Sequence, residues 1–260
     1  MPMSNISKTF NNLKKQGRKA FIPYIMAGDP SVERTKGLIK VLEECGADII
    51  ELGVPFTDPV ADGPVIQRAA ERALANGVTL RKVVSLVREI RLFSKIPIVL
   101  MTYYNPVFKY GEEAFIRDAS EAGVDGLIIP DLPPDEAGSL IPVARKHRVD
   151  TIFMLAPTST PERIKKVAKS SRGFIYYVSI TGITGARLLL EESVAESISR
   201  VRGLTKTHVA VGFGVGSPEE AKAVAALADG VIVGSAIVKR LSEPEEELRR
   251  FLSGLRDKIV

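Results

Sequence analysis

A single pattern repeats along the 260 residues of the sequence: a short apolar run rich in β-branched residues, then a stretch with helical periodicity. Most of the apolar runs end in Gly, Pro, Asp or Thr, which mark the start of a loop. Eight such runs are predicted to be strands: 21–25, 47–53, 96–102, 124–129, 151–155, 174–179, 208–212 and 230–233. Strand followed by helix, repeated eight times at about 27 residues per unit, is typical of an α/β fold of the closed, parallel (β/α)8 TIM barrel type.

No linker interrupts the series, so the sequence predicts one domain over residues 1–260. Helical periodicity is clear over 33–44, 114–122, 161–170 and 218–226, each between two predicted strands. Residues 6–15 are predicted to form a helix that caps the bottom of the barrel, and 244–255 the last outer helix. An open doubly wound sheet is the competing architecture, but it normally carries a dinucleotide-binding fingerprint after its first strand, and MAGDPS (26–31) has none.

Composition and charge exclude several classes of protein. Lys and Arg number 36 against 31 Asp and Glu, and they are scattered, which disfavours nucleic-acid binding but suits a small anionic substrate. The single cysteine, Cys45, cannot form an internal disulfide or a cysteine metal cluster, and no metal site is predicted. Residues 1–17 lack the apolar core of a signal peptide, and no apolar run nears the roughly 20 residues of a membrane span. We therefore expect a cytoplasmic protein that does not bind membranes.

Active sites of such barrels lie at the carboxyl ends of the strands, and this rule sorts the polar residues. Both histidines of the sequence, His147 and His208, fall at the opposite ends of predicted strands. A mechanism that depends on histidine is therefore disfavoured, and acid–base chemistry is expected from carboxylates or tyrosine.

Glu51, in the second predicted strand, is the strongest catalytic candidate. The alternation places Ala47, Ile49 and Glu51 on one face and the large apolar pair Ile50 and Leu52 on the other, which suits the helix-covered outside. Glu51 then points into the barrel, where a carboxylate costs several kcal/mol to desolvate unless it is paired or protonated, so its pKa should rise toward the catalytic range. The alternative, a salt-bridged core glutamate, has no obvious basic partner on a neighbouring strand.

Three further aspartates follow the first two strands. Asp62 stands before Gly-Pro, so it is either a catalytic carboxylate or the N-cap of the next helix, and the residues alone leave both open. Asp58-Pro59 by itself is typical of a turn, and Asp29 is expected to be a helix cap.

Glycine-bearing segments follow the last three predicted strands: TGITG (181–185), GFGVGS (212–217) and GSA (234–236). Glycine lets backbone N–H groups approach an anion closely, and Gly-Ser at the start of a helix presents its positive end. Because barrel enzymes often bind phosphate beside strands seven and eight, the three segments together predict a phosphorylated substrate.

Longer motifs go beyond a generic barrel: ELGVPFTDPVADGPVIQ (51–67), PYIMAGDP (23–30), TYYNPVFKYG (102–111), DLPPDE (131–136), GITG (182–185), FGVGSPE (213–219) and GSAIVK (234–239). In order and without large gaps from about residue 18 to 240, the sequence resembles the tryptophan synthase alpha chain family, whereas 188–197 match poorly. The resemblance implies a retro-aldol lyase that needs no cofactor and splits indole-3-glycerol phosphate into indole and glyceraldehyde 3-phosphate.

The resemblance also implies roles for single residues. Glu51 matches the family's acid/base, which moves a proton between the glycerol hydroxyl and indole carbon 3, and Asp62 matches the carboxylate that accepts or stabilises the indole N–H. Tyr176 matches an active-site tyrosine near Glu51, although ordinary strand packing also explains it. Thr184 matches the loop residue that closes over Asp62.

Substrate-binding residues are implied in the same way. The phosphate group is expected at the backbone of Gly185, Gly214, Gly234 and Ser235, with Phe213 beside it. Tyr24, Met101, Ile128 and Ile152 are candidates for an apolar indole pocket, or equally for plain barrel core. Tyr24 stands where some relatives have phenylalanine, and the sequence names no partner for its hydroxyl.

The family's partner is a separate beta chain, which uses pyridoxal phosphate to convert indole to tryptophan, in an expected alpha2beta2 complex. Asp58, Pro59, Asn105 and Pro106 match the loops that face this partner. No pyridoxal phosphate is expected in the present chain.

Two alternatives remain open at this stage. A phosphate-binding barrel isomerase of histidine or tryptophan biosynthesis shares the phosphate corner, but it commonly uses acid–base residues after strands one and five, and strand one here offers only Asp29. A barrel that has lost catalysis and activates a partner subunit would have no strong structural reason to keep Glu51 and Asp62.

Overall fold

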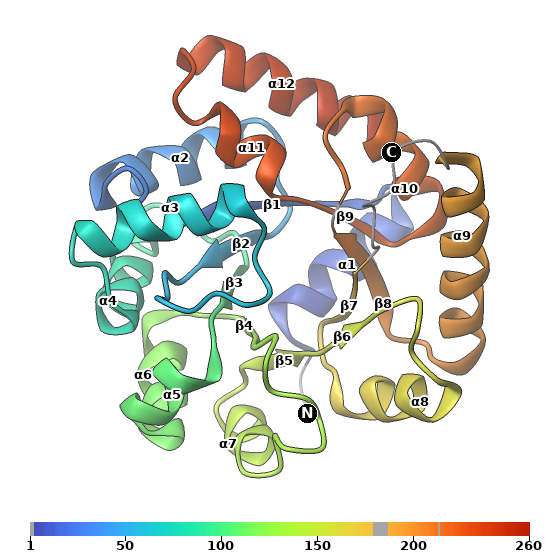
Figure 1. The fold of residues 1–260 in the computed structure, drawn as a ribbon, viewed down its shortest axis with the longest axis horizontal. Helices are drawn as coiled ribbons and strands as arrows, with labels where there is room; N and C mark the ends of the chain where they lie inside the picture. The colour runs from blue at the N-terminus through green and yellow to red at the C-terminus, as the bar shows by residue number, and fades with distance from the viewer. Residues whose placement is uncertain (1–2, 179–186, 213) are drawn as a thin grey trace.

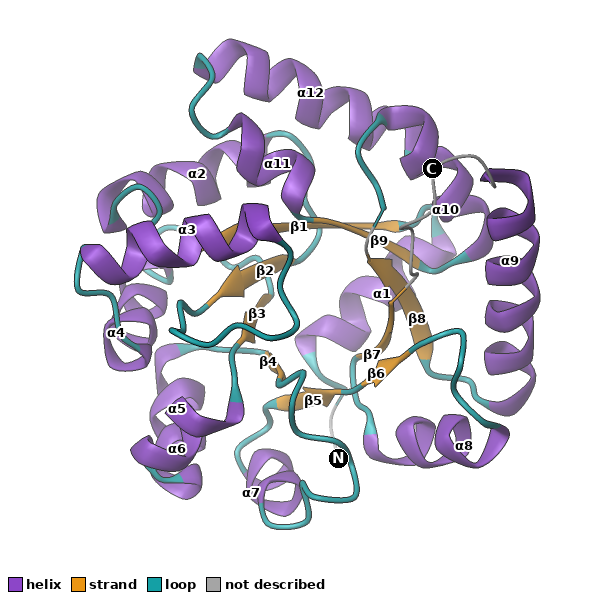
Figure 2. Cartoon of the chain, in the orientation of Figure 1, coloured by secondary structure: helices purple, strands orange, loops and turns teal. Residues whose placement is uncertain are grey.

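Parallel strands form the centre of the molecule and helices surround them, as Figure 1 and Figure 2 show in a view along the barrel. The computed structural model describes residues 3–178, 187–212 and 214–260. Its strands are β1 (Ala20–Met26), β2 (Ile50–Gly53), β3 (Ile98–Met101), β4 (Gly126–Ile128), β5 (Asp150–Ile152), β6 (Met154–Leu155), β7 (Phe174–Val178), β8 (His208–Gly212) and β9 (Gly230–Val233). Its helices are α1 (Asn5–Lys15), α2 (Val32–Glu44), α3 (Pro64–Ala75), α4 (Leu80–Ile90), α5 (Tyr104–Tyr110), α6 (Glu112–Ala122), α7 (Leu140–Lys146), α8 (Pro161–Ser170), α9 (Arg187–Leu204), α10 (Pro218–Leu227), α11 (Ser235–Arg240) and α12 (Glu245–Lys258).

The strands pair in parallel in the order β5-β4-β3-β2-β1-β9-β8-β7-β6. Residues 151–155, predicted as one strand, are divided between β5 and β6 at Phe153. The N–H of Phe153 donates to the Ser171 side chain at 3.3 Å, whereas its carbonyl accepts from Tyr176 N at 3.1 Å. This second bond connects the end of β5 to β7, at the two ends of the sheet. Because β5 and β6 are consecutive parts of one predicted strand, the nine described strands occupy eight positions around a nearly closed barrel. The predicted (β/α)8 architecture is confirmed.

Local sequence signals begin the outer helices. Ser31, Thr79, Thr160 and Ser217 are N-caps whose side chains accept the N–H of the third residue along, at α2, α4, α8 and α10. The predicted helix over 161–170 agrees with α8 at both ends, and the predictions over 33–44 and 218–226 agree with α2 and α10 to within one residue. Within the described ranges no helix is both long and apolar enough to cross a membrane.

Helix α1 lies across the end of the barrel at which the strands begin, behind the strands in Figure 1. Its Phe10 ring stacks on His208 at 4.8 Å between centroids and contacts Phe174 at 5.6 Å. Side chains added at Gly126 or Gly230 would press on Ile6 or Phe10, so glycine at these strand starts leaves room for α1. His208 therefore belongs to the bottom of the barrel, as its sequence position predicts.

Three aspartates at this bottom end form the same contact. Asp48, Asp125 and Asp229 each accept, through Oδ2, the backbone N–H of a residue at the start of the preceding strand: Phe21 (2.8 Å), Ile98 (2.9 Å) and Val209 (2.9 Å). Each also binds an arginine, respectively Arg256, Arg91 and Arg202. These carboxylates fix neighbouring strands in register.

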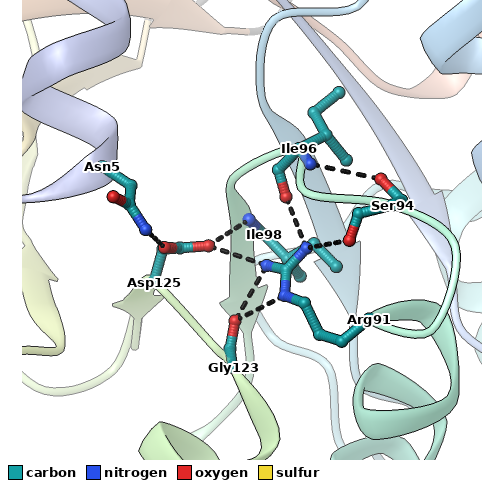
Figure 3. A network of polar contacts seen from close by, with 7 residues as sticks. All are labelled: Asn5, Arg91, Ser94, Ile96, Ile98, Gly123 and Asp125. Carbon is teal, nitrogen blue, oxygen red and sulfur yellow. Dashed lines mark hydrogen bonds and ion pairs between the residues drawn. The ribbon is translucent and has the colours of Figure 1, made fainter.

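Figure 3 shows the network around Asp125. Arg91, which follows α4, donates to Asp125 at 2.8 Å and to the carbonyls of Gly123, Ser94 and Ile96. Asn5 of α1 donates to the other carboxylate oxygen at 2.8 Å. The guanidinium and the carboxylate therefore join α1, α4 and the beginnings of β3 and β4.

Candidate active site

A cavity of about 310 Å³ opens at the other end of the barrel, where the strands finish. Of the residues predicted from the sequence to form a site, eight line it: Tyr24, Glu51, Asp62, Met101, Tyr176, Gly214, Gly234 and Ser235. Ile128 and Ile152 are buried in the barrel core and are not part of this described lining. Thr184, Gly185 and Phe213 lie outside the described residues.

Glu51 projects from β2 into the cavity and is only 1% exposed. Neither of its carboxyl oxygens has a hydrogen-bond partner among the described residues. Burial raises the pKa of Glu51 to about 8, and the nearby Asp62 carboxylate adds to the rise. The alternative of a salt-bridged core glutamate is not what the structure contains, because no cation pairs with Glu51 in the described part of the chain.

Asp62 lies at the end of the loop that connects β2 to α3. The N-cap of α3 is Gly63, with Pro64 as the first helical residue, so the interpretation of Asp62 as an N-cap is wrong. Its Oδ2 instead accepts a hydrogen bond from the Tyr103 hydroxyl at 3.2 Å, and its backbone carbonyl accepts from Gln67 Nε2 at 2.8 Å. Burial raises the pKa of Asp62 to about 6, while the bond from Tyr103 acts in the opposite direction. The carboxylate is thus free of a capping role and open to the cavity.

Tyrosines 24 and 176 bring two hydroxyl groups to the same cavity. The Tyr24 ring lies over Gly53 and the Tyr176 ring over Gly212, and a Cβ at either glycine would collide with the hydroxyl. Burial and the two carboxylates raise both tyrosine pKa values well above the ordinary value, so both hydroxyls stay protonated. The sequence did not identify a partner for the Tyr24 hydroxyl. In the structure this hydroxyl faces the sulfur of Met26 at 4.0 Å.

The predicted phosphate corner lies where β8 and β9 end. Gly214 has a φ of +80°, a conformation that glycine adopts readily, and it stands two positions after the last residue of β8. Gly234 and Ser235 lead from β9 into the short helix α11, and Lys239, one helical turn beyond Ser235, lines the same cavity. The corner therefore combines backbone N–H groups with one ammonium group.

Two polar residues were not predicted from the sequence: Lys239, which lines the cavity, and Tyr103, which contacts Asp62 from behind the lining. Tyr103 follows β3 within the TYYNP motif, and Lys239 ends the GSAIVK motif. Ser235 and Lys239 are four residues apart, so their side chains lie on the same face of a helix, and this spacing could have identified Lys239 from the sequence. For Tyr103 no local signal existed, because its partner Asp62 lies 41 residues earlier in the chain.

The expectation that Asp29 caps a helix is also wrong. Ser31 is the N-cap of α2, and the buried Asp29 carboxylate instead binds Arg72 through two bonds of 2.7 and 2.8 Å. Asp29 is therefore committed to a structural ion pair. This removes the acid–base candidate after strand one that a barrel isomerase would require.

The residues predicted to face a partner lie at the rim of the cavity end, Asp58 and Pro59 in the loop between β2 and α3 and Asn105 and Pro106 in the first turn of helix α5 rather than in a loop. Asp58 and Asn105 are exposed, and Pro59 and Pro106 are half-buried. Apolar side chains stand among them, since Val60 is 84% and Phe108 is 66% exposed. Among the described residues, no group of three or more His, Cys, Asp or Glu side chains is arranged to hold a metal ion.

Comparisons with known proteins agree with this geometry. The sequence model of the family described as tryptophan synthase alpha chain matches residues 10–258. The tryptophan synthase alpha chain of Geobacter sulfurreducens is 52% identical over 262 residues, covering 99% of both chains, and that of a Picosynechococcus strain is 48% identical over 99% of this chain and 100% of its own. Among solved structures, the alpha subunit from Legionella pneumophila superposes with a TM-score of 0.91 at 39% identity, and a chain of Mycobacterium tuberculosis tryptophan synthase with 0.92 at 42% identity, each covering 99% of both chains.

Proposed function

The chain belongs to the tryptophan synthase alpha chain family, whose members cleave indole-3-glycerol phosphate to indole and glyceraldehyde 3-phosphate, and we propose that Glu51 and Asp62 carry the proton transfers of this lyase reaction here. The observation that carries the proposal is the pair of carboxylates in one cavity with pKa values of about 8 and about 6. At pH 7 the first is mainly protonated and the second mainly ionised. A carboxylic acid and a carboxylate base then stand ready in the same site.

The reaction needs both groups. Protonated Glu51 donates to carbon 3 of the indole ring, and the bond between that carbon and the glycerol chain then breaks. The glycerol hydroxyl becomes the aldehyde and returns its proton to Glu51, so the acid is regenerated. Asp62 stabilises the indole N–H while positive charge develops on the ring. The hydroxyls of Tyr24 and Tyr176, both protonated, flank Glu51 and contribute no competing charge.

Substrate binding follows from the lining of the cavity. The phosphate binds the backbone N–H groups of Gly214, Gly234 and Ser235, and the indole ring lies against Tyr24 and Met101. We propose the roles that the resemblance implies for Gly185 and Phe213, as phosphate-binding residues, and for Thr184, as the residue that closes over Asp62. Ile128 and Ile152 are proposed for the inner end of the indole pocket. The backbone glycines and the ring-sized apolar wall are what support this orientation.

No cofactor takes part in this chemistry, because the acid and the base are protein side chains. The partner is a beta chain, as in the family. We further propose an alpha2beta2 complex through the loop that carries Asp58 and Pro59 and the start of α5 with Asn105 and Pro106. We also propose a cytoplasmic location. The exposed Val60 and Phe108 support the contact. Any pyridoxal phosphate then belongs to the beta chain. Indole release should rise when the beta chain is added, and equal rates with and without it would contradict the interface.

The test is indole release from indole-3-glycerol phosphate by the purified chain without added cofactor. We expect a bell-shaped dependence of kcat/KM on pH, rising near pH 6 as Asp62 ionises and falling near pH 8 as Glu51 loses its proton. Asp62→Asn should remove the acidic limb and lower the rate roughly hundredfold. A wild-type chain that released no indole, or an Asp62→Asn variant with wild-type turnover, would overturn the proposal.

A further inference from the structure

Tyr103 connects the loop that carries Asp62 to the body of the barrel. It stands just after β3 as the residue before α5, and it is 3% exposed. Its hydroxyl forms two hydrogen bonds to this loop: it donates to Asp62 Oδ2 at 3.2 Å and accepts from Ala61 N at 3.0 Å. Its ring stacks on Phe56, from the beginning of the same loop, with 5.2 Å between ring centroids.

The loop has little else to fix the direction of the Asp62 side chain. Its own backbone bonds are local, from Val60 N to Asp58 O and from Asp62 N to Pro59 O. The Gln67 side chain holds the carbonyl of Asp62 but not its carboxylate. Among the described residues, the bond from Tyr103 is the one hydrogen bond that the carboxylate receives.

We propose that Tyr103 is a positioning residue for the lyase reaction: its hydroxyl holds one carboxylate oxygen of Asp62 so that the other faces the indole N–H. The inference rests on the proposed role of Asp62 and goes beyond it, because Tyr103 acts through Asp62 and is not among the described residues that line the cavity. A group held in advance needs no reorganisation as charge develops on the ring, and such preorganisation is the largest source of electrostatic catalysis.

The charges around Asp62 define what loss of this bond should do. Glu51 on β2, Tyr24 on β1, Tyr176 on β7 and Lys239 on α11 share the cavity with it. Burial disfavours the ionised carboxylate, and the hydrogen bond from Tyr103 favours it. Without the hydroxyl, Asp62 should therefore hold its proton to higher pH.

Tyr103→Phe tests the proposal, because it removes the hydroxyl and keeps the ring on Phe56. We expect kcat to fall roughly tenfold with KM nearly unchanged, and the acidic limb of the pH profile to move upward by about half a unit to one unit. Tyr110→Phe is the matched control: it also breaks a bond from tyrosine to carboxylate, to Asp118 at 2.8 Å, but away from the cavity. This control should leave kcat and the acidic limb unchanged.

A double-mutant cycle separates positioning from a structural role. If Tyr103 acts through Asp62, adding Tyr103→Phe to Asp62→Asn should lower the remaining rate by less than about twofold. Wild-type kcat and an unmoved acidic limb in Tyr103→Phe would overturn the proposal, as would a tenfold loss that persists in the Asp62→Asn background. Failure of the proposed function is distinct from both outcomes, since then the wild-type chain or Asp62→Asn itself gives the unexpected rate.

Discussion

Asp125 at the bottom of the barrel and Glu51 at the top are both carboxylates largely withdrawn from solvent, but their surroundings are opposite. At the bottom, Asp125 accepts bonds from the Ile98 N–H, from Asn5 and from Arg91 (Figure 3). At the top, Glu51 is more deeply buried and receives no hydrogen bond from the described residues. The bottom carboxylate is used to join strands and helices, whereas the top one is left able to exchange a proton.

The difference comes from partners rather than from burial. Burial raises the pKa of Asp125 as well as that of Glu51. At Asp125 the backbone N–H, the amide and the guanidinium all act against the rise in pKa. At Glu51 the charge of the Asp62 carboxylate adds to the rise. An unpaired buried carboxylate avoids the cost of desolvation by taking up a proton, and this makes it an acid near neutral pH.

The largest effect that the comparison predicts is on activity, in Glu51→Gln. The amide keeps the shape of the side chain but cannot donate or accept the transferred proton, so indole release should fall about thousandfold. Circular dichroism and thermal melting should show an intact fold, because no hydrogen bond is lost. Near wild-type turnover would show that the unpaired carboxylate is not the acid/base.

Much of the fold could be predicted because its signals are local. Short apolar runs rich in β-branched residues predicted the strands, and helical periodicity over 161–170 predicted α8. The interruption at Phe153 could not be predicted, because its N–H bonds to Ser171, a contact that exists only in the closed barrel. A tertiary contact that takes one backbone N–H out of the strand pairing does not change the pattern of apolar residues in the sequence.

The same distinction applies to the site. The direction of Glu51 followed from the two-residue period of its strand. For Asp62 the N-cap interpretation failed because glycine also caps helices, and only the backbone geometry assigns the cap to Gly63. Asp29 pairs with Arg72 and Asp62 with Tyr103, each more than 40 residues apart. Such pairings require the fold before they can be recognised.

Asp125→Ala should have the next largest effect, on stability instead of activity. Removing the carboxylate leaves the Arg91 guanidinium and the Ile98 N–H without their shared acceptor inside the barrel end, which should lower the free energy of unfolding by about 3 kcal/mol. Urea denaturation measures this. Asp125→Asn, which keeps an acceptor for Ile98, is the milder companion and should lose less. Indole release per folded molecule should be unchanged in both variants, and a loss there would break the separation between the two ends.

An effect of similar size is expected in the way the free energy of unfolding changes with pH, through Glu51 at the top of the barrel. Glu51 releases its proton near pH 4.5 when unfolded and near pH 8 when folded, so the folded state binds more protons between these values. Its contribution is complete below pH 4.5 and is lost as pH rises through 8, about 3 kcal/mol between pH 5 and pH 8. Denaturation curves of wild type and Glu51→Gln across this range should therefore differ in slope. Parallel curves would mean that the folded Glu51 ionises like an exposed glutamate.

The smallest effect on the free energy of unfolding is expected where a carboxylate is paired but exposed to solvent. Arg250 and Glu247 on α12 form an ion pair of 2.8 Å with side chains 73% and 50% exposed. Water already solvates both charges, so Arg250→Gln should change the free energy of unfolding by less than about 0.5 kcal/mol, and salt should reduce even that. Urea denaturation at low and high ionic strength provides the measurement. A loss as large as that of Asp125→Ala would show that pairing alone, without burial, accounts for the bottom of the barrel.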